Sequence, residues 1–258
     1  MRLFKIFKPK IKFKELDYRS DQNKKTVDNN ITVRRGDLFT VAYSDLGKKL
    51  FLNQRLFRKV YKIWTSGKAK YEDSQIKLTI VDVIPEYWRQ EETLANMVLE
   101  LKDTNKKFYI KVGNAWPMEV NGKIERLNFG RPVEEMGLLK LISDHGINVI
   151  PAHLGITIRG HNFIVYDYVP FITVADAGLK GFISGRTKRK ISNLLDNITE
   201  EINLTLKRDP KKYGFREQKI VYDLKLENTF LDSNTKRLFV FDPTAISLSK
   251  ITGDLFQK

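Results

Sequence analysis

Four polar residues in the C-terminal part of the sequence have types and spacings that suit one chemistry. Asp223, Lys225 and Asn228 fall within six residues, and Asp242 follows fourteen residues after Asn228. Magnesium prefers hard oxygen ligands, usually one or two carboxylates together with phosphate oxygens. Phosphoryl transfer also needs a carboxylate that orients the attacking hydroxyl and cations that offset the phosphate charge. The four residues therefore indicate metal-dependent phosphoryl transfer, and a polar surface loop is the alternative interpretation.

Short apolar runs around these residues predict the elements that hold them. Residues 220–221 and 229–231 read as short strands on either side of the polar run, and residues 237–241 read as a strand that ends at Asp242. A tight hairpin between the last two strands would bring Asp242 back beside Asn228.

The alternation of apolar and polar residues further upstream predicts a sheet followed by helices. A helix is expected to begin near residues 130–132, because proline suits the first turn of a helix. A long amphipathic helix is expected over residues 191–206 and ends at Asp209-Pro210. Five strands are expected, over residues 76–84, 95–101, 107–112, 154–159 and 162–168.

The N-terminal region is strongly basic. The 258-residue chain has 46 Lys and Arg against 31 Asp and Glu, a net charge of +15, and residues 1–14 and 46–71 contain no acid. Residues 1–30 read as a basic tail and linker, and residues 31–70 as a basic helical extension with one apolar stripe from about Ser44 to Trp64. Such charge attracts polyanions, so nucleic acid or an anionic membrane is expected to bind through residues 1–70.

Two compositional features bear on the compartment. The sequence has no cysteine and no run of ~18 apolar residues. A cytoplasmic protein is therefore expected, with peripheral association with a membrane as a further option.

The polar run resembles a known family. Val221–Asp232 resembles the catalytic loop of the protein-kinase superfamily, and Phe241-Asp242-Pro243 stands where that family has its metal-binding Asp-Phe-Gly. The resemblance implies that Asp223 is the catalytic base and that Lys225 contacts the transferring phosphate. It also implies that Asn228 and Asp242 hold magnesium.

Upstream segments extend the resemblance. Lys111, in Tyr-Ile-Lys, is similar to the third-strand lysine that contacts the α- and β-phosphates of ATP in that family. Glu135 is the implied partner of Lys111, with Glu134 as the fallback. Tyr166 and Tyr168 stand where the family has the hinge whose backbone binds adenine. ATP and Mg²⁺ are therefore the implied cofactors.

The fold implied by the resemblance belongs to the α+β class. It is a bilobal protein-kinase-like fold with a five-stranded antiparallel N-lobe sheet over residues 76–169, a reduced helical C-lobe over residues 170–258 and a basic N-terminal extension. Residues 85–94 lack the glycine-rich loop of the family, and only sixteen residues follow Asp242. The short C-lobe is similar to that of RIO kinases and of small-molecule kinases.

The expected function is that of an atypical ATP-dependent kinase, of the serine/threonine or small-molecule type. It would transfer the γ-phosphate to a hydroxyl acceptor with Mg²⁺. The alternative is a pseudokinase-like nucleotide-binding or scaffolding module whose basic N-terminal region binds nucleic acid or an anionic membrane. His145, His153 and His161 each stand near a predicted turn, so loop positions are expected for them rather than a metal site.

Overall fold

The computed structural model describes residues 10–19, 31–36, 39–83, 93–115, 117–120, 123–126, 131–215 and 219–247. The chain is a mixed α/β protein that divides into two compact units. We call Lys25–Lys140 with Ile150–Val169 the sheet unit, and Met1–Lys24, Leu141–Val149 and Pro170–Lys258 the C-terminal unit. Within the described ranges, no helix is both long enough and apolar enough to cross a membrane.

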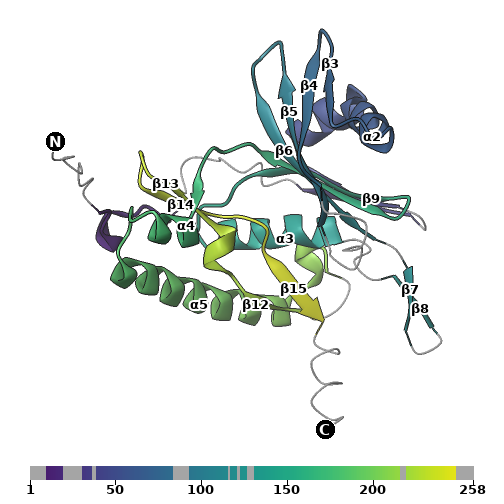
Figure 1. Cartoon of the computed structure of the whole chain (residues 1–258). Coiled ribbons are helices and arrows are strands. Elements are labelled where there is room, and N and C mark those ends of the chain that lie inside the picture. Colours follow the sequence, from purple (N-terminus) through teal and green to yellow (C-terminus); the bar gives the residue numbers. More distant parts are fainter. Residues whose placement is uncertain are drawn as a thin grey trace, which may run out of the picture. The chain divides into compact units, whose positions relative to one another are not determined.

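The sheet unit is built on an eight-stranded antiparallel sheet with the order β1-β2-β9-β10-β6-β5-β4-β3 (Figure 1). Along β6, Phe108, Ile110 and Val112 are buried, while the residues between them are less buried, as the two-residue period of a strand requires. The strands are β1 Thr32–Arg35, β2 Phe39–Tyr43, β3 Lys70–Glu72, β4 Ile76–Val83, β5 Thr93–Leu101, β6 Lys107–Asn114, β9 Ala152–Ile158 and β10 His161–Asp167.

The prediction of a five-stranded sheet is wrong. The five predicted strands correspond to β4, β5, β6, β9 and β10, which are contiguous in the sheet, but β1 and β2 extend it at one edge and β3 at the other. β2 pairs with β9 from Phe39↔Ile158 to Tyr43↔Leu154. Edge strands join through backbone hydrogen bonds, so short strands such as Lys70–Glu72 need no apolar pattern that a sequence would reveal.

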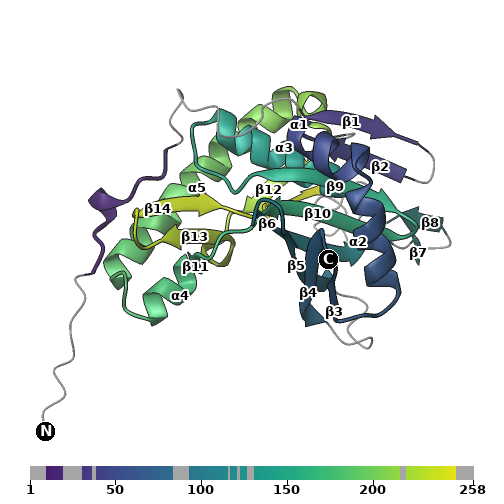
Figure 2. The same ribbon diagram turned by 90° about the horizontal axis from the view of Figure 1, so that it is seen from above.

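Helix α2 (Leu56–Thr65) lies across one face of this sheet (Figure 2). The ring of Phe163 on β10 contacts Phe57 edge-on at 5.2 Å between centroids and Trp64 at 5.4 Å. The single helical stripe predicted from Ser44 to Trp64 is divided into α1 (Asp45–Gly47), the π-helix η2 (Lys48–Asn53) and α2. The division falls at Arg55, whose φ of 57° ends one helical path before α2 begins.

Helix α3 (Arg131–Asp144) begins near the predicted position and packs in its first turns on the opposite face of the sheet. Leu154 and Ile156 of β9 belong to the core on the α2 side, so Gly155 between them faces α3. A Cβ on Gly155 would lie 2.7 Å from the carbonyl oxygen of Pro132. Only glycine therefore allows the first turn of α3 to approach β9 this closely.

The C-terminal unit combines helices with two small sheets. Helix α5 (Gly185–Arg208) confirms the predicted amphipathic helix, because Ile191, Leu195, Ile198, Ile202 and Leu206 are all buried. One sheet has the order β11-β13-β14, and the other pairs β12 with β15. The elements are η1 Phe13–Glu15, β11 Ile172–Thr173, α4 Val174–Leu179, η4 Lys211–Tyr213, β12 Lys219–Asp223, η5 Leu226–Asn228, β13 Thr229–Asp232, β14 Arg237–Val240 and β15 Thr244–Ser247.

Two more features complete the description. Strands β7 (Pro117–Val120) and β8 (Lys123–Arg126) pair as a separate antiparallel ribbon. In the C-terminal unit, Asp17 and Glu15 form ion pairs with Arg237 and Lys236, which attach the described N-terminal residues to the β13–β14 turn.

The contact between α1 and β9 predicts a large effect of Gly47→Ala. A Cβ on Gly47 would lie 1.7 Å from the carbonyl oxygen of His153, and backbone cannot yield as a side chain does. We expect a loss of about 1–3 kcal/mol or more in the free energy of unfolding, measured by urea denaturation. Gly185→Ala is the control, because a Cβ there meets nothing within 4 Å and alanine favours the first turn of α5. Equal stability of the two variants would contradict the packing.

Candidate functional site

Lys111 lies in the middle of β6, opposite Ile164 of β10 and Asn96 of β5. Its side chain is half-buried and lines a pocket together with Glu135 of α3. The other residues of the pocket are Gly113, Arg131, Pro132, Asn162 and Ile164. The structure therefore brings Lys111 and Glu135 to one place.

Glu135 is only 2% exposed. Removing a carboxylate from water is costly unless a cation or hydrogen-bond donors compensate it, and two cations, Lys111 and Arg131, line the same pocket. Glu134, the fallback partner, is half-buried and is not among the residues that line the pocket. The pocket thus combines a buried acid with bases, a composition suited to binding an anion beside an ion pair.

The segment predicted to contact adenine spans the end of β10, with Tyr166 inside the strand and Tyr168 just after it. Tyr166 is fully buried, whereas Tyr168 is 40% exposed. The Asp167 amide donates to the Pro151 carbonyl at 2.9 Å, and the Tyr168 amide donates to the Lys107 carbonyl at 3.2 Å. Two backbone donors that a nucleotide base would need are therefore already engaged within the sheet unit.

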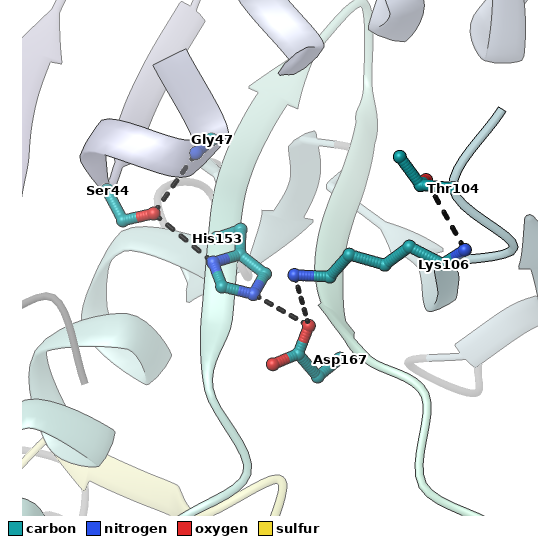
Figure 3. A network of polar contacts seen from close by, with 6 residues as sticks. All are labelled: Ser44, Gly47, Thr104, Lys106, His153 and Asp167. Atoms are coloured by element: carbon teal, nitrogen blue, oxygen red, sulfur yellow. Dashed lines mark hydrogen bonds and ion pairs between the residues drawn. The ribbon is translucent and has the colours of Figure 1, made fainter. Parts of the chain in front are cut away.

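A polar network fixes the side chain of Asp167, as Figure 3 shows. His153 Nε2 lies 3.0 Å from Asp167 Oδ1, and Lys106 Nζ lies 3.4 Å from the same oxygen. Ser44 Oγ is 3.3 Å from His153 Nδ1 and accepts a hydrogen bond from the Gly47 amide at 3.1 Å. Because the carboxylate only accepts, the consistent arrangement has Nε2–H donating to Asp167 and the Ser44 hydroxyl donating to Nδ1.

Burial acts to raise the pKa of Asp167, but the hydrogen bond from His153, helped by the charge and hydrogen bond of Lys106, outweighs it and holds the pKa below its usual value. The set of Ser44, His153 and Asp167 has the composition of a hydrolytic triad. However, Ser44 and His153 are 3% and 7% exposed, and the serine hydroxyl caps helix α1. The network therefore braces the end of β10 rather than presenting a nucleophile.

The loop position expected for His153 is wrong. It lies within β9 and is buried, whereas His145 follows the end of α3 and His161 opens β10. The eight-residue spacing between the three histidines did not predict that His153 is buried. Its polar partners, Ser44 and Asp167, lie at other positions in the chain. Within the described part of the chain, no cluster of three or more His, Asp or Glu residues could hold a metal ion.

The C-terminal unit brings Asn228 and Asp242 together. β13 and β14 pair from Thr229↔Val240 to Asp232↔Arg237, so the residues just outside the hairpin meet. Asn228 Nδ2 donates to the Asp242 main-chain carbonyl at 3.0 Å, and the Phe241 amide donates to the Asn228 carbonyl at 2.8 Å. Asp242 has a φ of 50°, a left-handed conformation that aspartate adopts more readily than most residues.

The donors of this pair suit magnesium. The NH₂ group of the Asn228 amide is used in the bond to Asp242, so the oxygen of that amide is its remaining ligand atom. One amide oxygen and one neighbouring carboxylate are hard donors of the kind that Mg²⁺ takes together with phosphate oxygens. The residues therefore fit the ion that the sequence predicted for them.

The other two residues of the polar run lie just before this pair. Lys225 is exposed, and its carbonyl accepts from the Asn228 amide at 3.0 Å and from Thr229 Oγ1 at 2.9 Å. Asp223 closes β12, where its backbone pairs with Thr244 after a register shift. The side chain of Asp223 lies outside the part of the chain that the structure describes.

Sequence reasoning missed Asn203 of helix α5. Its Nδ2 donates to the Val221 carbonyl at 2.6 Å, and its Oδ1 accepts from the Val221 amide at 2.7 Å. Val221 is fully buried, so this side chain satisfies backbone groups that water cannot reach. The signal in the sequence is an asparagine inside a helix, where its propensity is poor, directly beside the buried Ile202.

Comparison with known proteins gives little. No family model matches the sequence, and no curated protein matches it. Among solved structures, the BubR1 kinase domain aligns at 10% identity with a TM-score of 0.36, covering 80% of this chain and 61% of that chain. The chain thus spans about three fifths of the length of that domain. An overlap this loose does not establish a shared fold.

Asn203→Ala should destabilise the protein, because it leaves the buried amide and carbonyl of Val221 without partners. We expect a loss of about 2–4 kcal/mol in the free energy of unfolding, measured by denaturant titration. Asn203→Asp keeps an acceptor for the Val221 amide but sets a carboxylate oxygen against the Val221 carbonyl, so it should also destabilise the protein. If Asn203→Ala were as stable as the unchanged protein, the two hydrogen bonds between Asn203 and Val221 would not contribute to the free energy of unfolding.

Asp167→Asn should lower stability at pH 7 by about 1–2 kcal/mol, because it removes the charge that His153 and Lys106 bind. A carboxyl whose pKa is depressed by folding stabilises the protein above its unfolded pKa of about 3.9, and this contribution disappears as the pH falls through the folded pKa. The difference between the two proteins should therefore shrink below about pH 4. The measurement is the melting temperature of each protein as a function of pH, with Asp103→Asn, at an exposed position, as the control. If the melting temperatures of Asp167→Asn and the unchanged protein differed by the same amount at every pH, the result would contradict the proposed role of the network.

Proposed function

We propose that the protein is an atypical ATP-dependent kinase with a protein-kinase-like fold, which transfers the γ-phosphate to a hydroxyl acceptor with Mg²⁺. The observation that carries the proposal is the hydrogen-bonded pair of Asn228 and Asp242 at the base of one hairpin. An amide and a carboxylate at this spacing, after Asp223 and Lys225, form the metal-binding part of the resemblance to kinases.

The sheet unit supports the same proposal. Its central strands and helix follow one another as β4, β5, β6, α3, β9 and β10, the order of three strands, helix and two strands that the resemblance implies. Lys111 and the buried Glu135 share a pocket within this unit. An ion pair there would hold the lysine ammonium in place for phosphate oxygens.

Each residue has one role in the proposed reaction. Asp223 takes the proton of the acceptor hydroxyl as its oxygen bonds to the γ-phosphorus and the bond to the β–γ bridging oxygen breaks, releasing ADP. Lys225 and Lys111 contact phosphate oxygens, and Asn228 and Asp242 hold the metal. Magnesium supplies charge neutralisation on the phosphates when bound. The acceptor is a hydroxyl of a protein or of a small molecule.

A second candidate is a pseudokinase-like module that binds nucleotide, or serves as a scaffold, without transfer. The engaged amides of Asp167 and Tyr168 favour it, since they reduce the donors left for a base. The absence of a glycine-rich loop in residues 85–94 favours it too, although residues 84–92 lie outside the described residues.

The test combines binding with transfer. Millimolar Mg-ATP should raise the melting temperature through ligand linkage, and radiolabelled ATP should yield ADP or a labelled acceptor. Asp223→Ala should lower turnover by about 10²–10⁴-fold, the usual contribution of a general base. Asp242→Asn, which keeps the left-handed backbone accessible, should abolish the turnover that Mg²⁺ supports, because it removes a carboxylate ligand of the metal.

Matched controls lie on the same elements or surfaces. Lys111→Met should remove the thermal shift, whereas Lys107→Met, on the same face of β6 with an exposed ion pair to Glu100, should not. Asp196→Asn on the exposed side of α5 controls for loss of one negative charge. Turnover that survives Asp223→Ala and Asp242→Asn would contradict the kinase proposal. A thermal shift with Mg-ATP but without turnover would favour the pseudokinase-like module.

A further inference from the structure

In the sheet unit, the segment from η2 to the residues just after α2 carries cations that the proposed kinase reaction does not use. We define the basic face as Lys48, Lys49, Arg55, Arg58, Lys62 and Lys68, all of them exposed. Arg58 and Lys62 are four residues apart, so they lie on one side of helix α2, and Arg55 stands immediately before the first residue of the helix. Residues 46–71 contain no acid that could neutralise them.

The two acids that follow the basic face in the sequence are paired with other lysines, and Asp45, which precedes the face, is exposed. Asp73 forms an ion pair with Lys59 and also accepts hydrogen bonds from the backbone amides of Gln75 and Ile76. Glu72 pairs with Lys102 at 2.7 Å. Among the described residues, no acid lies within ion-pair distance of the six cations of the basic face. The positive charge of this face is therefore presented to solvent.

Stability does not explain this arrangement. Arg55 has a left-handed backbone with φ of 57°, it makes no side-chain cap at the start of α2, and it places a cation at the positive end of the helix dipole. Arg58 and Lys62 are also a like-charge pair at a repulsive helical spacing. Each of these features lowers the stability of the folded protein. A bound polyanion would compensate the repulsion between these cations, because its negative charges attract them.

The structure favours nucleic acid over a membrane as that polyanion. The apolar residues of α2, Leu56, Phe57, Val60 and Ile63, are buried in the core of the sheet unit, so the helix cannot insert them into a bilayer. The large hydrophobic side chains that are exposed in the described residues, such as Phe39 and Val81, lie outside residues 44–70. Attraction on this face is therefore electrostatic, as in binding to a phosphate backbone.

We propose that the basic face binds the phosphate backbone of nucleic acid without reading its sequence. This binding does not depend on the kinase proposal, because it uses none of the residues assigned to nucleotide or metal. Lysine and arginine on one helix face contact phosphates, and no described feature of the face offers a site for reading bases.

The experiment measures anisotropy of a labelled 20-base-pair DNA duplex and of a labelled single-stranded RNA with the full chain, from 50 to 200 mM NaCl. We expect log K to fall linearly with log salt, since each phosphate contact releases counterions. Arg58→Glu/Lys62→Glu should weaken binding at least tenfold at low salt and reduce the steepness of the salt dependence by about 2, or about 1 per lost contact. Arg58→Gln/Lys62→Gln, which adds no acid, should have a smaller effect in the same direction.

The control is Lys180→Glu/Lys211→Glu, which changes net charge equally at exposed positions of the C-terminal unit. It should leave affinity within about twofold. Arg55→Asn should weaken binding yet raise the melting temperature, because asparagine adopts the left-handed conformation more readily and removes the cation from the helix start. A purely structural role for Arg55 would not produce that opposition.

Three outcomes would overturn the proposal. The first is an unchanged affinity in Arg58→Glu/Lys62→Glu, and the second is an equal loss in the control, which would reduce the effect to net charge. The third is tighter binding to phosphatidylserine vesicles than to either nucleic acid at the same salt, lost in the same variant. That result would assign the face to a membrane surface.

Discussion

Two backbone segments pack against strand β9 too closely for a side chain between them, and the positions of Glu135 and Asp167 depend on this packing. Gly155 admits the first turn of α3 on one side, and the carbonyl of His153 lies against Gly47 of α1. Neither contact leaves room for a Cβ atom. Because α3 carries Glu135 and the neighbouring β10 carries Asp167, the spacing around β9 sets where both carboxylates lie.

The charged side chains of the sheet unit fall into two groups that differ in how their charge is compensated. Its buried and half-buried acids lie beside cations or hydrogen-bond donors: Glu135 shares a pocket with Lys111, and Asp167 is held by His153 and Lys106. On the basic face, cations stand without acids. Charges taken out of water must be compensated within the protein, whereas exposed charges need no internal partner and can be compensated by a ligand.

The C-terminal unit positions its polar run by backbone contacts rather than by side-chain packing. The β13–β14 hairpin brings Asn228 beside Asp242, where the Asn228 side-chain NH₂ group donates to the Asp242 main-chain carbonyl, and Asn203 holds the backbone of Val221 two residues before Asp223. Both side chains bond to main-chain groups, and the bond of Asn228 does not use the oxygen of its amide. A single helix, α5, thereby supports the strand that leads into the proposed catalytic residues.

The sequence by itself determined the central strands, the amphipathic helix α5 and the pairing of Asn228 with Asp242. These depend on side-chain period and on a short hairpin, both of which are local. The tertiary structure alone decided that β1, β2 and β3 extend the sheet at its two edges, that His153 is buried and that Asn203 holds the backbone of Val221. Strand pairing uses backbone groups that every residue has, so the side-chain pattern of a short strand does not predict it. The partners of His153 and Asn203 lie far away in sequence or on another element, so no local pattern predicts these contacts.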